Sequence, residues 1–245
     1  MYRDPAFRRK RGFSLLNVLY KESIPFAGTY ENESNTCVLY RQPQSSDDIT
    51  TLHEVMHAFI DQANPDIPDY IKTVIRQPEN NPLNFEAIET YHLFQEGIAT
   101  WGSWETFSLI QGNDKETREF IHMDVMKKLL RITDRSIAEE DITQQFALIM
   151  ERFNLRKDLI NNPNLRNIKK YHMLVKDRSI QTVVYGHYFV NKVMSELTGQ
   201  GISVGNALRT LVLNPPNQPP TLEELKDPIA FSHNLIKNKE ALNDV

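Results

Sequence analysis

The sequence predicts an α+β fold, with a small region of strands near the N-terminus and a mostly helical body behind it. Two observations lead to this prediction. Residues 24–41 carry many β-branched and aromatic side chains on both sides of a turn-like Glu-Asn-Glu-Ser-Asn segment, which is the pattern of a β-hairpin. From residue 84 onward, apolar side chains recur every three or four positions, which is the pattern of helices packed on a core.

The composition is that of an ordinary globular protein. The chain has 245 residues, of which 40% are hydrophobic and 24% charged, so it is long enough to bury a sizeable core. Its formal net charge of −4 speaks against nucleic acid as a partner. No apolar run approaches the ~20 residues of a membrane span, and no signal peptide is visible. With a single cysteine, Cys37, and therefore no intrachain disulfide, we expect a cytoplasmic protein.

The first long helix is predicted to follow the hairpin and to run to about Asp61. Serine and aspartate at residues 45–48 offer N-caps, and the proline-containing segment 64–68 ends the helix. A stripe of apolar side chains runs along it, which we expect to lie on the core. These residues are Leu52, Val55, Met56, Phe59 and Ile60.

The second long helix is predicted over residues 85–101 and has two distinct faces. Its apolar face would dock on the core, and the opposite face carries Glu89, His92, Glu96 and Thr100. Further helices are expected at about residues 115–132, 137–154, 156–176, 179–198, 204–213 and 222–237. We divide the chain into residues 1–110, with the hairpin and the first two helices, and a helical half, 111–245, as parts of one continuous unit.

The first helix contains the pattern H-E-x-x-H, from His53 to His57. On a helix these two histidines are one turn apart and project the same way, so both rings can reach one ion. In this pattern the histidines bind zinc and the glutamate, here Glu54, works on the water at the metal. The sequence therefore predicts a Zn²⁺ site on the first helix, with Glu54 as the general base.

A catalytic zinc ion needs a third protein ligand, which leaves the fourth position for water. Glu96 is the best candidate, because it lies on the polar face of the second helix and the neighbouring Gly97 lets another helix approach closely. His92, one turn earlier, is the alternative ligand. Glu89 and Thr100 are candidates for orienting a histidine ring by a hydrogen bond.

H-E-x-x-H followed on a second helix by Glu96-Gly97-Ile98-Ala99 resembles the layout of the gluzincins, the glutamate-ligand zinc peptidases that include thermolysin and the aminopeptidases. This resemblance implies a zincin-like metallopeptidase fold and a peptide or protein substrate, hydrolysed by metal-activated water. Residues 1–110 would then form the zinc-binding catalytic half, and residues 111–245 would close the cleft.

Two further stretches extend the resemblance. Gly28-Thr-Tyr-Glu-Asn32 is similar to the aminopeptidase pattern G-x-M-E-N, whose glutamate, here Glu31, holds the α-amino group of the substrate. The segment around Gly186 is similar to the glycine-containing helix of the gluzincins. The transition-state tyrosine of the family falls at Val183 in this chain, which departs from the pattern. Tyr185 and His187 are the candidates for the oxyanion donor, and the alternative that neither acts at the zinc stays open.

The alternatives that remain open belong to different classes. The enzyme would be an endopeptidase or, through Glu31, an aminopeptidase. Because Val183 stands where the family has tyrosine, the chain is alternatively a zinc-binding regulatory or interaction protein of the same fold with impaired catalysis. A purely helical interaction protein without metal is the third hypothesis. The sequence leaves the oligomeric state open.

Overall fold

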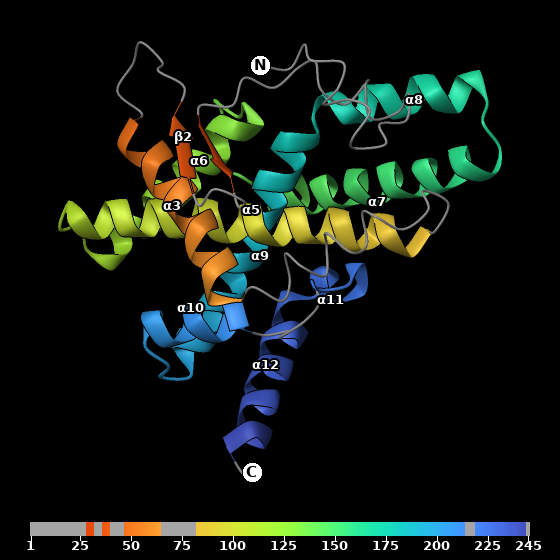
Figure 1. Cartoon of the computed structure of the whole chain (residues 1–245). Helices are drawn as coiled ribbons and strands as arrows, with labels where there is room; N and C mark the ends of the chain where they lie inside the picture. The colour runs from red at the N-terminus through yellow and green to blue at the C-terminus, as the bar shows by residue number, and fades with distance from the viewer. Residues whose placement is uncertain (1–27, 32–35, 40–46, 65–81, 214–218, 244–245) are drawn as a thin grey trace.

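The computed structural model describes the backbone of residues 28–31, 36–39, 47–64, 82–213 and 219–243 (Figure 1). Side chains are described for residues 49–64, 86–213 and 219–237. Within these ranges the chain forms nine helices and one pair of short strands. The helices are α3 (Asp47–Ala63), α5 (Pro82–Ile110), α6 (Lys115–Leu130), α7 (Glu139–Asn161), α8 (Leu165–Lys176), α9 (Arg178–Gly199), α10 (Val204–Leu213), α11 (Leu222–Lys226) and α12 (Pro228–Asn243).

The predicted α+β fold, and the zincin-like fold with it, is wrong: the described chain is all-α. Strands β1 (Gly28–Glu31) and β2 (Thr36–Leu39) have four residues each and pair antiparallel, with Gly28 opposite Leu39. A pair of this length lies against α3 but forms no layer, because too few side chains lie on either face to bury a core. Helices alone build the core of the described chain.

The centre of the core is the crossing of α5 and α9. Figure 1 shows α5, in yellow, running across the body with α3 and α9 against it. A Cβ atom built on Gly97 would lie 2.4 Å from the carbonyl oxygen of Gly186, and one built on Gly186 would lie 2.4 Å from that of Leu93. The two backbones therefore touch without an intervening side chain. The prediction that Gly97 permits the close approach of another helix is confirmed, and that helix is α9.

Around this crossing, helices from both predicted halves share one hydrophobic core. Ile60 of α3 and Phe94 of α5 belong to the same cluster as Phe189 of α9 and Leu211 of α10. Helices α7, α10 and α12 pack on α9, and α6 packs on both α5 and α9. None of the described helices has both the length and the apolar character that a bilayer crossing requires.

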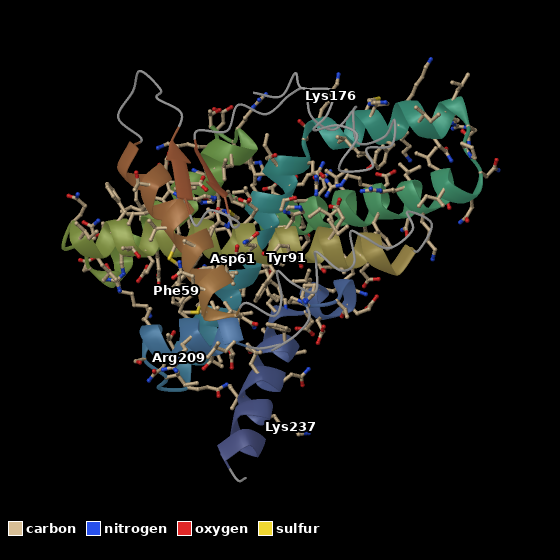
Figure 2. The ribbon with its side chains drawn as sticks, viewed as in Figure 1. Phe59, Asp61, Tyr91, Lys176, Arg209 and Lys237 are labelled. Carbon is tan, nitrogen blue, oxygen red and sulfur yellow. The ribbon has the colours of Figure 1, made fainter. Side chains whose placement is uncertain are left out.

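Helix α3 is fastened to α5 along much of its length. The Asp61 carboxylate accepts hydrogen bonds from the Tyr91 hydroxyl, at 3.0 Å, and from the Gln95 amide, at 3.1 Å. Figure 2 labels Asp61 and Tyr91 where the two helices meet. Nearer the start of α3, Met56 fills the space beside Gly102, where an added Cβ would lie 2.5 Å from the Met56 methyl carbon. These contacts determine which residues of α3 face Glu96.

The predicted apolar stripe of α3 is only partly correct. Ile60 is 4% exposed and Met56 packs against the core, but Val55 is 47% exposed and Phe59 39% exposed (Figure 2). The side of α3 that faces the protein carries polar residues instead: Glu54, His57 and Asp61 are all buried, as is Asn64 directly after the helix. The helix is therefore held by polar contacts as much as by apolar ones.

Several predicted helix boundaries are also wrong. Helix α5 runs on to Ile110, and the helix expected over residues 222–237 is divided into α11 and α12 at Asp227. The break expected between residues 154 and 156 does not exist, because α7 continues to Asn161. The real break lies at Asn162-Pro163, since proline disfavours helical geometry in the residue before it. Asn164 then caps α8: its side chain accepts a hydrogen bond from the backbone N–H of Asn167 at 2.9 Å.

Candidate metal centre

The three predicted metal ligands come together between α3 and α5. The Nε2 atoms of His53 and His57 are 3.1 Å apart. One carboxylate oxygen of Glu96 lies 3.3 Å from the His53 Nε2, and the other lies 3.6 Å from the His57 Nε2. The structure thus brings together a group of His53, His57 and Glu96 that could hold a metal ion.

These distances match the requirements of a small tetrahedral ion. With ligand bonds of about 2.0–2.2 Å, the ligand atoms of such an ion are about 3.3–3.6 Å apart. The nearest approaches in this group run from 3.1 to 3.6 Å, with His53 and His57 facing different oxygens of Glu96, and one ligand atom from each residue lies within 4.8 Å of the other two. The two imidazole rings stand edge to face, with centroids 4.7 Å apart and an interplanar angle of 81°, so their nitrogens converge without the rings colliding. An ion could be held with little movement of the side chains.

The charges of the three groups are strongly coupled. Burial alone would raise the pKa of Glu96, but the His57 charge and the hydrogen bond with His53 lower that pKa to about 2. Burial lowers the pKa of His57 to about 4. Burial also acts to lower the pKa of His53, yet its hydrogen bond to Glu96 and the charges of Glu96 and Glu54 outweigh it and raise that pKa. At neutral pH the group therefore offers a carboxylate and a neutral His57, both suited to a cation.

Glu54, the predicted general base, adjoins this group on α3. Its side chain is buried, with 6% of the residue exposed. Its charge acts on His53, which shows that the carboxylate lies near the first ligand. A buried carboxylate beside a pair of histidines suits a proton acceptor, because it is shielded from bulk water.

His92, the alternative ligand, does not belong to the group of three. It lies one turn before Glu96 on α5 and is exposed to solvent. It is nevertheless close enough for its charge to act on both His57 and Glu96. The structure therefore places His92 beside the candidate metal site but outside its ligand set.

The sequence suggested that Glu89 orients a histidine ring, but in the structure its carboxylate has other partners. Its carboxylate binds Arg152 at 2.7 Å and Arg178 at 3.3 Å, and Arg156 lies 4.0 Å away. Burial would raise the pKa of Glu89, but the charges of Arg178 and Arg152 lower it to about 2. Glu89 is therefore part of a buried ion cluster that joins α5 to α7 and α9.

Tyr185, one of the two expected oxyanion donors, lies in the core. Its hydroxyl donates a hydrogen bond to the carbonyl oxygen of Leu225 at 2.8 Å, and its ring stacks on Phe146 with centroids 4.5 Å apart. Burial raises the pKa of the hydroxyl. The structure thus engages the Tyr185 hydroxyl with α11 and does not bring it to His53, His57 and Glu96.

His187, the other expected donor, lies in a second histidine pair. Its Nε2 is 3.1 Å from the Nδ1 of His122, whose Nε2 is 3.3 Å from a carboxylate oxygen of Glu105. Burial, together with the His122 charge, lowers the pKa of His187 to about 3. The ring of Trp101 stacks on His122 at 6.2 Å. His187 thus serves to join α9 to α6, a contact that no sequence spacing indicates.

The sequence did not reveal the role of Asp61, a buried carboxylate that fastens α3 to α5 next to the candidate site. A signal for it was present, because Asp61 lies four residues after His57 and so near it on the same helix. For Glu31, the structure describes only the backbone, which ends β1 opposite Thr36. Its side chain lies outside the described residues, and the aminopeptidase hypothesis stays a prediction.

Comparison of the chain with protein-family models, with curated proteins and with solved structures finds no match.

Proposed function

We propose that the protein is a zinc-dependent metallopeptidase with two histidines and a glutamate as ligands, which hydrolyses peptide bonds with Glu54 as the general base. The observation that carries this proposal is the convergence of His53, His57 and Glu96 at 3.1–3.6 Å, with the buried Glu54 beside them. Two imidazoles and one carboxylate are the ligand set of known hydrolytic zinc sites, and three protein ligands leave a position open.

The roles of the residues follow from their chemistry. His53, His57 and Glu96 would hold the ion, and a bound zinc ion lowers the pKa of water and polarises a carbonyl group. Glu54 takes a proton from the attacking water, whose oxygen forms the new bond to the scissile carbonyl carbon. Glu54 then passes this proton to the leaving amine when the C–N bond breaks. One water is consumed, and one carboxylate and one amine are produced.

The proposal is tested with Glu54→Gln, which keeps the shape of the side chain but cannot take the proton. We expect turnover of a fluorogenic peptide library to fall by about 10²–10⁴-fold while zinc stays bound in a 1:1 ratio. Glu119→Gln, which removes an exposed carboxylate from α6, is the matched control and should leave turnover unchanged. Unchanged turnover in zinc-loaded Glu54→Gln would show that the mechanism is wrong.

The endopeptidase and aminopeptidase versions differ in what they require of the substrate. An aminopeptidase that uses Glu31 needs a free α-amino group, so it cleaves free peptides but not their N-acetylated forms. An endopeptidase cleaves both. The same peptide library, with and without N-acetylation, therefore separates the two versions.

A zinc-binding regulatory protein with impaired catalysis is the second candidate function. It is favoured by one observation: the hydroxyl of Tyr185 is bonded to Leu225, and His187 is paired with His122. If zinc-loaded wild-type protein cleaves no member of the library, this second function replaces the first. The Co²⁺-substituted protein then tells whether four protein ligands close the site.

A further inference from the structure

The face of α5 beside the candidate metal centre carries a histidine that the proposed mechanism does not use. His92 lies four residues before Glu96, so the two side chains are neighbours on the helix surface, with Cβ atoms about 5–6 Å apart. Its charge reaches both Glu96 and His57. It therefore borders two of the three ligands.

His92 is exposed to solvent. The other two histidines at the site, His53 and His57, are themselves candidate metal ligands. His57 is 8% exposed and Glu54 6% exposed. A substrate must approach the ion from a side that solvent can reach. His92 thus borders the site at a position that solvent reaches.

Both residues that the sequence suggested as oxyanion donors are engaged elsewhere. The Tyr185 hydroxyl donates to the Leu225 carbonyl at 2.8 Å, and the His187 ring lies 3.1 Å from that of His122. In the described part of the chain, His92 borders the site without being one of its three ligands, and its ring carries an N–H group.

We propose that His92 is a catalytic residue that donates a hydrogen bond from its ring N–H to the scissile carbonyl oxygen as negative charge develops on it. This inference rests on the proposed peptidase function. It assigns the donor to the ligand-bearing helix α5 and not to α9. The hydrogen bond strengthens in the transition state and involves no net transfer of the proton, so it lowers the barrier without changing the products.

The environment of His92 suits a neutral donor. Desolvation by the protein around the ring and then the positive charge of Arg178 lower the pKa of His92 to about 4, although the charges of Glu89 and Glu96 act to raise it. A neutral ring has one N–H and one bare nitrogen, and the N–H is sufficient for this role. Glu89 binds Arg178 at 3.3 Å, so the two charges that act most on the ring belong to one ion pair.

The test compares His92→Ala and His92→Gln with wild type, all as full-length, zinc-loaded protein. Gln keeps an N–H donor on a side chain of similar reach, and Ala does not. The peptide that wild type cleaves best in the library is the substrate. We expect kcat of His92→Ala to fall by about 10²–10³-fold with KM within about threefold, and His92→Gln to recover part of that loss. His233→Ala, which removes an exposed histidine from α12, is the matched control.

Two readouts besides activity separate a donor from a ligand or a structural residue. A phosphonamidate analogue of the same peptide, which mimics the tetrahedral transition state, should bind His92→Ala about 10²–10³-fold more weakly than wild type. Zinc affinity, Tm and the absorption spectrum of the Co²⁺-substituted protein should not change.

Other outcomes overturn the inference in distinguishable ways. A kcat of His92→Ala within about threefold of wild type shows that His92 is not the donor. A fall in zinc affinity with an altered Co²⁺ spectrum shows that it is a ligand. If wild type cleaves no peptide, the proposed peptidase function fails, and this inference fails with it.

Discussion

The three candidate ligands differ in how tightly they hold protons. The hydrogen bond to Glu96 and the charges of Glu96 and Glu54 favour the protonated ring of His53, whereas burial disfavours the protonated ring of His57. In the metal-free protein, a proton on His53 therefore occupies the place that a cation would take. Metal binding must displace this proton, because a ring nitrogen that carries a proton cannot coordinate.

The affinity for zinc is accordingly expected to depend on pH. Between about pH 4, the pKa of His57, and the raised pKa of His53, one proton leaves for each ion bound. Affinity should therefore rise about tenfold per pH unit in that window and level off above the His53 pKa. Chelator competition at a series of pH values measures this. A flat profile across the window would mean that His53 is not a ligand.

The same pKa shifts affect the stability of the metal-free fold in opposite directions. Because folding raises the pKa of His53, this residue stabilises the fold fully when the pH is below its pKa in the unfolded chain. That stabilisation is lost as the pH rises through its pKa in the folded protein. Because folding lowers the pKa of His57, neutral His57 stabilises the fold fully when the pH is above its pKa in the unfolded chain. That stabilisation declines as the pH falls toward about 4. The His57 effect acts below the ordinary histidine pKa of 6.5 and the His53 effect acts above it, so together they favour a stability maximum near that pH.

For individual residues, the sequence revealed the candidate metal ligands but not the contacts of the expected oxyanion donors. His53, His57 and Glu96 were predictable because helical spacing alone brings the histidines together, and a glycine marks the helix contact beside Glu96. The surroundings of Tyr185 were not predictable, because they depend on α11, some 40 residues away in the chain. Local spacing carries no information about such a partner.

Among the helices, the contact of α5 with α9 is the one that tolerates least change. The backbones touch at Gly97 and Gly186, where an added Cβ would lie 2.4 Å from a carbonyl oxygen. Neither backbone can yield as a flexible side chain would. The helices must therefore separate if either glycine is replaced.

Gly97→Ala is expected to destabilise the fold by about 1–3 kcal/mol, because it overpacks a rigid contact. Urea denaturation measures the change. Gly205→Ala is the matched control: it also adds one methyl group to a helix, but no atom lies within 4 Å of the added carbon. That control should be neutral or stabilising by up to about 1 kcal/mol. Equal effects of the two variants would contradict the close contact described here.

The lengths of the helices were harder to predict than their existence. Apolar periodicity located every long helix, but it misplaced the junction of α7 and α8, since the pattern continues through residues 154–156. The proline at position 163 was the better signal. The sequence also did not reveal that the inner side of α3 is polar. Asp61 can be buried there because its carboxylate accepts hydrogen bonds from Tyr91 and Gln95 of another helix, α5.

For the whole molecule, the fold class was the main error of the sequence prediction. The β-forming character of residues 24–41 was real, since β1 and β2 pair there. That character does not reveal how many strands a sheet will have. The described chain buries its apolar side chains between helices, and one core joins residues from both predicted halves.

Because the candidate ion would join α3 to α5, metal removal should affect the entire fold. With free zinc at about 100 times its Kd, binding adds about 2.7 kcal/mol to stability, or about 5–10 °C in Tm for a chain of this size. Differential scanning calorimetry with and without a chelator measures this. In the variant His53→Ala/His57→Ala the chelator should have no effect. An equal shift in that variant would mean that the ion binds elsewhere.

The adjacency of Glu96 and Gly97 has an evolutionary consequence. Glu96 faces α3 and is constrained by the candidate ion, whereas Gly97 faces α9 and is constrained by the backbone of that helix. A descendant of this protein that abandoned metal binding would be free to replace Glu96, but it would still need glycine at position 97. A glycine opposite Gly186 is therefore the trace that such a lineage would keep after its chemistry had gone.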